Sequence, residues 1–308
     1  MDVTLYEVGP RDGLQNEAAR LPVDAKLRLI EAIAAAGLSR IEVGSFVRAD
    51  WIPQLADTDE VARRLRPRPG VRYSALVPNR LGLDRALAAG LREVAVFMSS
   101  SEAHNLKNTN KSIAQSLEHF REIVPVATQA GATVRAYLST VWGCPYQGKV
   151  DPRRSLEISL ELKQMGCSEI SLGDTIGVGN PRQTTEIVRL FFQTGFSADE
   201  LALHLHDTHG TALANTLAAL ELGVRIFDTS IGGMGGCPYA PGAAGNLATE
   251  DLASMLADMG IATGIDLEKL IDAGELAQQL IGRKLTGRRL QAALGRRAGG
   301  EARPGAST

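Results

Sequence analysis

The chain has 308 residues, of which 44% are hydrophobic and 22% are charged, and its formal net charge is -2. These values are ordinary for a globular protein, and the length suits one α/β barrel with an extension. So small a net charge creates no global field that would attract nucleic acid or an anionic membrane, and we expect neither as a partner. An anionic substrate would have to be held by local positive charge.

The sequence shows no pattern of a membrane span, a leader peptide or a disulfide framework. No apolar run reaches the length of a transmembrane helix, and the opening MDVTLYEVGPRDG predicts a strand followed by a loop. We therefore expect a cytoplasmic protein. Cys144, Cys167 and Cys237 are too sparse to predict disulfides or a structural zinc site, although one of them could be a functional thiol.

Short apolar segments alternate along the chain with longer stretches that carry apolar residues at three- and four-residue spacing. Eight such βα units are the number that closes a parallel barrel, so the pattern favours a (β/α)8 TIM barrel. An open doubly wound sheet is the alternative, but it would need fewer strands and a Gly-rich phosphate-binding turn. The predicted strands are 3–8, 40–43, 73–77, 93–97, 133–139, 169–172, 201–206 and 226–229.

A short C-terminal extension follows the eighth predicted strand. A Gly-rich loop at 232–245 leads to two helical segments, about 249–259 and 267–281. We expect residues 1–295 to form a single barrel domain with these helices. Residues 296–308 are rich in Arg, Gly, Ala and Pro, which predicts a disordered tail.

Polar residues gather where the predicted strands end. The active site of this fold forms at the C-terminal ends of the strands, so residues far apart in the sequence converge on one mouth. This coincidence carries more weight than any single motif. The residues placed there are Arg11, Asp12, Glu42, Asp174, His204, His206, Cys237 and Asn246.

The segment LALHLH at 201–206 is the sharpest local signal. Side chains alternate along a strand, so His204 and His206 point into the barrel while the leucines face the helices. Two imidazoles on one face can chelate a cation; a pair of satisfied core histidines is the alternative. Two imidazoles alone would suit zinc or iron as well as magnesium or manganese, but with Asp12 and Asn246 as oxygen ligands the set favours Mg2+ or Mn2+. Asp12 could instead cap a turn.

The remaining acids and histidines are expected to play smaller parts. Asp174 and Asp207 could orient the metal ligands without binding the metal themselves. His209 is at most a supporting residue, and we expect His104 and His119 at the surface.

The loop at 232–239 carries a thiol on a glycine-rich backbone, which could close over a substrate and bring Cys237 to the reacting carbon. A plain connection with an incidental cysteine is the alternative. Cys144 lies in a similar Gly-Cys-Pro-Tyr context, and the residues alone do not rank the two. Cys167, just before the sixth predicted strand, is expected to be structural.

With these residues assembled, the chain resembles the 3-hydroxy-3-methylglutaryl-CoA lyase family along almost its whole length. The wider superfamily of metal-dependent lyases and synthases shares the Arg-Asp pair, the Glu after the second strand and the His-x-His motif. The stretches that carry the resemblance are EVGPRDGLQNE (7–17), IEVGSF (41–46), GCPY (143–146), SLGDTIG (171–177), HLHD (204–207) and GGCPYAPGAAGNLATE (235–250).

The resemblance implies a TIM barrel that cleaves an acyl-CoA with a divalent cation, Mg2+ or Mn2+, and that forms a homodimer. Asp12, His204, His206 and Asn246 are then the metal ligands. The proton of the substrate's C3 hydroxyl would pass to Asp12 or to a histidine such as His204, and that choice stays open.

The other roles also follow from the resemblance. Arg11 would polarise the thioester carbonyl and steady the enolate, and Glu42 would hold Arg11. Cys237 would protonate the departing acetyl-CoA carbanion, while Asp174 would support substrate binding. The coenzyme's phosphates need cations at the mouth, for which the candidates are Lys107, Lys111 and Lys149.

Three rival functions remain. A synthase of the same superfamily would lack the Gly-Gly-Cys-Pro-Tyr loop and would usually carry a further C-terminal domain. A lyase for a longer branched 3-hydroxyacyl-CoA would have the same catalytic set. A barrel that binds acyl-CoA without catalysis would not need every one of the polar residues at the barrel mouth.

Overall fold

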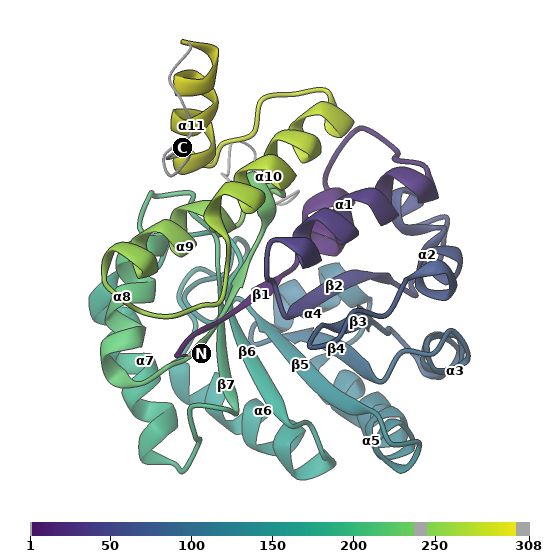
Figure 1. Ribbon diagram of the computed structural model, residues 1–308. Helices are drawn as coiled ribbons and strands as arrows, with labels where there is room; N and C mark the ends of the chain where they lie inside the picture. Colours follow the sequence, from purple (N-terminus) through teal and green to yellow (C-terminus); the bar gives the residue numbers. More distant parts are fainter. Residues whose placement is uncertain (1, 237–244, 300–308) are drawn as a thin grey trace.

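The computed structural model describes residues 2–236 and 245–299. Eight parallel strands form a closed barrel in the order β1 to β8, with β8 paired to β1. Figure 1 shows the strands at the centre and the helices around them. This confirms the predicted TIM barrel. The strands are β1 (Thr4–Glu7), β2 (Arg40–Ser45), β3 (Arg72–Leu76), β4 (Glu93–Ser99), β5 (Thr133–Ser139), β6 (Glu169–Asp174), β7 (Leu201–Leu205) and β8 (Ile226–Thr229).

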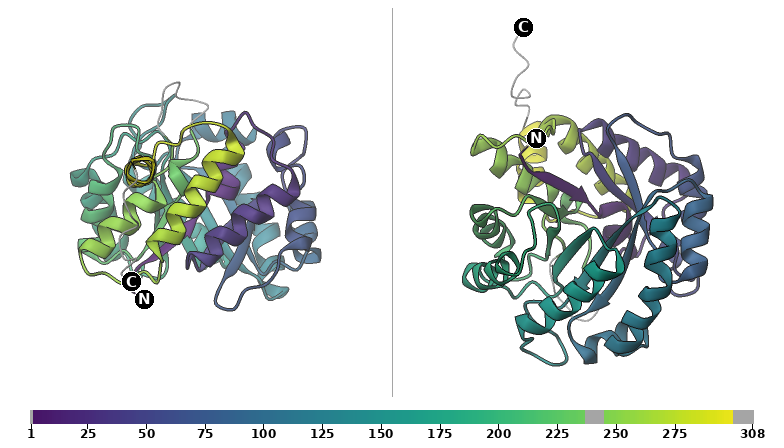
Figure 2. Two further views of the ribbon diagram at one scale, coloured as in Figure 1. Left: turned by 45° about the horizontal axis from the view of Figure 1, so that its top comes forward. Right: turned by 90° about the horizontal axis from the view of Figure 1, so that it is seen from below.

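Helices follow the strands and cover the outside of the barrel. α10 lies beside α1, so the C-terminal extension packs against the first helix, as Figures 1 and 2 show. The helices are α1 (Val23–Ala35), α2 (Thr58–Arg64), α3 (Arg80–Ala88), α4 (Glu102–Thr109), α5 (Ile113–Gln129), α6 (Pro152–Met165), α7 (Pro181–Gln193), α8 (Ala212–Leu222), α9 (Thr249–Asp258), α10 (Leu267–Ile281) and α11 (Arg288–Ala298).

Local sequence explains where these helices begin and end. Asn180 caps α7 in a reciprocal capping box with Gln183, so two backbone N–H groups at the helix start are satisfied by side chains. Gly166 and Gly223 end α6 and α8 in the left-handed conformation, which glycine adopts without strain. Every residue of β7 is buried, because helices cover its outer side chains and the barrel interior takes the others.

The C-terminal boundary differs from the predicted one at 295. α11 continues to Ala298 because it is amphipathic: Leu290 and Ala293 are buried, and Arg297 forms ion pairs with Glu268 and Glu275. The predicted tail therefore begins at least three residues too early. Residues 300–308 lie outside the described part of the chain.

Across residues 2–236 and 245–299, no helix combines the length and the apolar character that crossing a bilayer requires.

Candidate active site

Three of the predicted metal ligands meet at the C-terminal ends of the strands. Asp12 lies in a tight helical turn, Gly9–Gly13, directly after β1, whereas His204 is in β7 and His206 follows it. One potential ligand atom from each lies within 4.8 Å of the others, so the three residues form a cluster that could hold a metal ion. The Nε2 atoms of the two imidazoles are 3.2 Å apart.

The fourth predicted ligand, Asn246, lies against the same cluster. Its backbone forms an isolated antiparallel bridge with His206, which ties the segment after the glycine loop to the end of β7. Its Nδ2 donates to Asp12 Oδ2 at 2.8 Å and to the Met234 carbonyl at 3.0 Å. Both amide hydrogens are thus engaged by oxygen atoms, and Oδ1 is the atom left to act as a ligand.

The electrostatic environment puts these groups in the forms that bind cations. Burial raises the pKa of Asp12, but the charge of Arg11, helped by His204 and His206, outweighs burial and brings the pKa down to about 2. Burial lowers the pKa of His206 to about 4, and the neighbouring His204 acts in the same direction. At neutral pH the site therefore offers a carboxylate and an imidazole with a free lone pair.

Arg11 is held between two carboxylates. Its Nε lies 2.5 Å from Glu42 Oε2, and its NH1 lies 2.6 Å from Asp12 Oδ1. The side chain of Glu42 is fully buried and that of Arg11 is 8% exposed. Because the two carboxylates engage Arg11 on different nitrogens, the guanidinium is fixed in direction and presents its remaining face to the pocket.

His204 has a further partner that the sequence analysis missed. Asp228, in β8, places Oδ2 3.1 Å from His204 Nδ1, while its Oδ1 accepts from Arg135 at 2.5 Å. Asp228 and Arg135 are both buried inside the barrel. The sequence signal was present, because Asp228 and Arg135 are charged residues within otherwise apolar strands, where a charge must have a partner.

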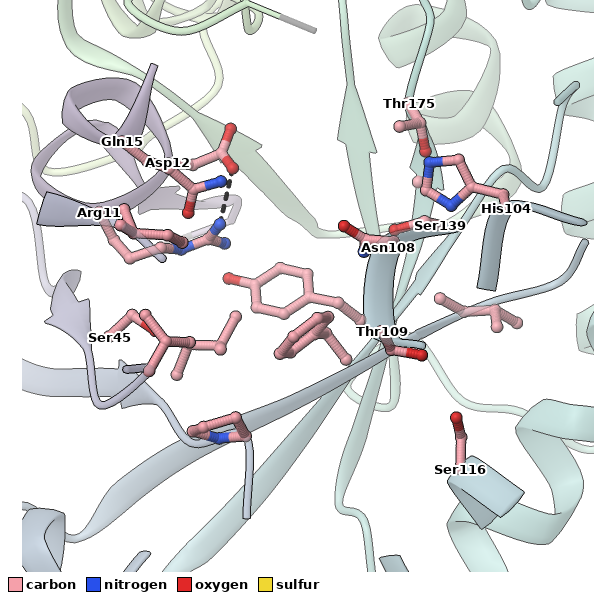
Figure 3. Close-up of a pocket in the computed structure, with 18 of the residues that line it drawn as sticks. Arg11, Asp12, Gln15, Ser45, His104, Asn108, Thr109, Ser116, Ser139 and Thr175 are labelled. Atoms are coloured by element: carbon pink, nitrogen blue, oxygen red, sulfur yellow. Dashed lines mark hydrogen bonds and ion pairs between the residues drawn. The ribbon is translucent and has the colours of Figure 1, made fainter. Parts of the chain in front are cut away.

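A cavity of about 480 Å³ opens beside the cluster and includes Arg11, Asp12, His204 and His206 in its wall. Figure 3 shows Arg11, Asp12 and Gln15 on one side of it and His104, Ser139 and Thr175 on the opposite side. Its apolar lining comes from Val47, Trp51, Ile52, Leu76, Pro78, Phe97, Phe120, Tyr137 and Leu138. One side of the cavity is therefore charged, and much of the rest is apolar.

Two predicted acids take other positions. Asp174 is fully buried and does not line the cavity; its carboxylate accepts from the backbone N–H groups of Val178 and Gly179. It therefore holds the loop after β6, which differs from the expected place against substrate. Asp207 pairs with Arg288 rather than with a metal ligand.

The expectation that His104 lies at the surface is wrong. His104 is 2% exposed and lines the cavity, with its Nδ1 2.6 Å from Ser99 Oγ. Burial lowers its pKa to about 4. The polar segment that contains it folds over the barrel mouth, because Asn105 accepts from the Ser99 backbone and donates to the Lys111 carbonyl.

The cysteines divide into two groups. Cys144 and Cys167 are buried and free, and neither lines the cavity. Cys237 lies outside the described residues, which resume at Gly245. The glycine just before it, Gly236, is part of the cavity wall.

Fold and site together define a (β/α)8 barrel with a candidate divalent-metal centre at the mouth where such enzymes carry their chemistry. Residues 2–277 match the model of one family, and the chain belongs to that HMGL-like family. The resemblance seen in the sequence is thereby confirmed.

Individual relatives agree with this assignment. The chain is 49% identical over 290 residues to the mitochondrial hydroxymethylglutaryl-CoA lyase of Bos taurus, covering 94% of this chain and 89% of the relative. It is 48% identical over 292 residues to a Pseudomonas aeruginosa 3-hydroxy-3-isohexenylglutaryl-CoA/hydroxy-methylglutaryl-CoA lyase, covering 95% and 97% of the two chains. An Acinetobacter baumannii HMG-CoA lyase, solved with coenzyme A and 3-methylmalate, is 40% identical with a TM-score of 0.90, and the match covers 94% of each chain.

Proposed function

We propose that this protein is a hydroxymethylglutaryl-CoA lyase, which cleaves 3-hydroxy-3-methylglutaryl-CoA to acetyl-CoA and acetoacetate with the help of Mg2+ or Mn2+. The observation that carries the proposal is the cluster of Asp12, His204 and His206 beside Arg11. It lies in a chain that is 49% identical to a lyase of that name along almost its whole length.

The residues present fit a hard divalent cation. The ligands would be the Asp12 carboxylate, Nε2 of His204 and of His206, and Oδ1 of Asn246, completed by oxygen atoms of substrate or water. Among the described residues His206 Nδ1 is buried without a hydrogen-bond partner, and its Nε2 lies 3.2 Å from His204 Nε2, so Nε2 is the nitrogen placed to bind a cation. A cation held there would polarise the substrate oxygens and lower the pKa of the C3 hydroxyl.

The proposed reaction balances with the residues at hand. The C3 hydroxyl loses its proton to Asp12, or to His204 where its Nε2 is not bound to the cation. The C3 oxygen then forms the ketone of acetoacetate as the C2–C3 bond breaks, and the electron pair of that bond moves onto C2 and the thioester. Arg11 faces the oxygen on which this charge develops, and Glu42 keeps it aimed there. Cys237 would then return a proton to C2, which completes acetyl-CoA.

The coenzyme would enter along the mouth of the cavity. Lys111, Arg48 and the exposed Trp51 lie in the cavity wall, where positive charge suits phosphates and an indole suits an adenine ring. Of the three lysines proposed from the sequence, Lys111 lines this cavity, whereas Lys107 and Lys149 do not. We therefore assign phosphate contact to Lys111 first.

A lyase for a longer branched 3-hydroxyacyl-CoA is the second candidate. Val47, Ile52, Leu76 and Phe97 form an apolar part of the cavity wall that could take an alkyl group larger than methyl. The Pseudomonas aeruginosa relative is named for both an isohexenyl and a methyl substrate. Both candidates use the same catalytic set, so substrate length is the only difference to test.

Homodimer formation and a cytoplasmic location belong to the proposal as well. Sedimentation of the purified chain at several concentrations would test the dimer. Localisation of a tagged full-length protein would test the compartment.

The deciding experiment is acetoacetate release from 3-hydroxy-3-methylglutaryl-CoA by purified protein with Mg2+, with Mn2+ and with a chelator. Fast release that the chelator abolishes supports the methylglutaryl lyase. A panel of branched analogues run in parallel separates the candidates: faster turnover of a longer chain favours the second. No turnover of any analogue would contradict both.

A further inference from the structure

We propose that Asp228, held by Arg135, is a positioning residue that keeps His204 in the one neutral form able to bind a cation through Nε2. The inference rests on the metal site proposed above and extends it into the barrel interior. Asp228 Oδ2 lies 3.1 Å from His204 Nδ1, on the side of the ring away from the metal cluster. The Asp228 side chain is fully buried.

The chemistry of the contact decides which nitrogen carries the proton. An ionised carboxylate can only accept hydrogen bonds, so Nδ1 of His204 must carry the hydrogen. Arg135 NH2 at 2.5 Å from Oδ1 and the Ser171 hydroxyl at 3.0 Å from Oδ2 both favour the ionised form of Asp228. In the neutral ring the lone pair is then on Nε2, which lies 4.0 Å from Asp12 Oδ2.

Arg135 cannot easily leave this position. Its side chain is 1% exposed, and its Nε lies 2.5 Å from Glu169 Oε1. Its NH1 donates to the Tyr137 hydroxyl at 3.0 Å, and its guanidinium carbon lies 4.0 Å from the centre of the Tyr6 ring. With each of its three nitrogens engaged and a ring against its face, Arg135 fixes where the Asp228 carboxylate sits.

The network continues away from the metal cluster to the N-terminal end of the barrel. Glu169 also pairs with Arg40 at 2.6 Å, and Arg40 pairs with Glu93, again at 2.6 Å. Glu93 is the first residue of β4, so it lies at the opposite end of the barrel from the site. Asp228, at one end of the network, thus contacts a proposed metal ligand, whereas Glu93, at the other end, lies far from the metal cluster.

The two histidines differ in this respect. His206 Nδ1 is buried and has no hydrogen-bond partner among the described residues. His204 is therefore the imidazole that the protein orients in advance, whereas no described residue fixes His206 through Nδ1 in a comparable way. A carboxylate behind a metal-binding histidine is a known way to set its tautomer and strengthen its bond to the metal.

The test compares wild type with Asp228→Asn. Metal-free protein labelled with ¹⁵N would be studied by NMR, in which the ring nitrogens of the five histidines report which one carries hydrogen. We expect His204 protonated on Nδ1 in wild type and a loss of that preference in the variant. Mn2+ affinity, measured by calorimetry, should fall about 10–100-fold.

Glu93→Gln is the matched control, because it makes the same carboxyl-to-amide change at the far end of the network. It should lower stability to urea but leave Mn2+ affinity and the His204 tautomer as in wild type. If Asp228→Asn does not fold, Ser171→Ala, which removes one hydrogen bond to Asp228, should shift the tautomer in the same direction. An unchanged His204 tautomer in the folded variant, or an equal loss of affinity in Glu93→Gln, would overturn the inference. Failure of wild type to bind Mn2+ would instead contradict the metal site. The NMR comparison of the metal-free proteins would still test whether Asp228 sets the His204 tautomer.

Discussion

The imidazoles of His204 and His206 face each other with their Nε2 atoms 3.2 Å apart. Two nitrogen lone pairs at that distance repel unless a proton or a cation lies between them. The Asp12 carboxylate beside them adds negative charge to the same space. A divalent cation would remove the repulsion among all three groups at once. Its binding would explain why these residues converge here from the ends of β1 and β7.

Substituting His206 by alanine should weaken Mn2+ binding by more than about 100-fold. The loss of a residue that only hydrogen-bonds to a metal ligand typically costs about 10–100-fold in affinity. The reason is that His206 would contribute a ligand atom directly. Calorimetric titration with Mn2+ measures the effect. His209→Ala, which removes an exposed imidazole three residues before the start of α8, is the control and should bind Mn2+ like wild type. Equal affinities for the two variants would remove His206 from the ligand set.

Replacing Cys237 by alanine should lower kcat by about 10²–10⁴, the usual contribution of a positioned acid. Mn2+ affinity should stay unchanged, because the thiol is not in the proposed ligand set. Cys144→Ser is the matched control: Cys144 is 3% exposed, lies 3.0 Å from Ser101 Oγ and does not line the cavity. If the two variants turn over at similar rates, the acid must be another group.

Much of the barrel could be predicted because its pattern is local. β5 and β8 have the predicted bounds, and so does α10. The inward direction of His204 and His206 followed from strand alternation alone, since a parallel strand has only two faces. Burial of both rings agrees with that expectation.

The parts that escaped prediction depend on contacts between distant residues. Arg135 and Asp228 are 93 positions apart in the sequence, and nothing local indicates that they meet. His104 does not share the strand alternation of His204 and His206, and that difference predicts a surface position. It is buried because Asn105 satisfies backbone polar groups that burial would otherwise leave unpaired. Sequence periodicity reports faces of helices and strands, but it does not report which polar groups satisfy each other across a barrel.

The contribution of Glu250 to stability should fall as the pH rises from about 5 to 8. Burial raises the pKa of Glu250 from 4.5 to about 8, with nearby Glu7 acting in the same direction, so the folded chain holds this proton more tightly than the unfolded chain. The stabilisation is complete below the unfolded pKa and is lost as the pH rises through the folded pKa. Each pKa unit corresponds to about 1.4 kcal/mol, so the loss amounts to a few kcal/mol.

Urea unfolding of wild type and Glu250→Gln across this pH range measures the effect. The variant should lack the loss that Glu250 causes in wild type, because glutamine stays neutral and its oxygen can still accept from the Gly232 N–H. Glu221→Gln, at an exposed site, should keep the wild-type slope. Parallel profiles for wild type and Glu250→Gln would show that Glu250 does not carry the pH dependence.

Gly235→Ala should damage the metal site through Asn246. Gly235 has a φ of +115°, and an added Cβ would lie 2.6 Å from Asn246 Nδ2. The left-handed backbone costs an alanine roughly 1–2 kcal/mol, and the contact would push the Asn246 amide away from Asp12. Mn2+ affinity should therefore fall about tenfold or more, together with stability to urea.

Gly236→Ala is the neighbouring control, because its Cβ would meet none of the described residues within 4 Å. A selective loss in Gly235→Ala would show that the glycine loop holds Asn246 in place, whereas equal affinities in the two variants would show that Asn246 is held by other contacts or does not bind the cation.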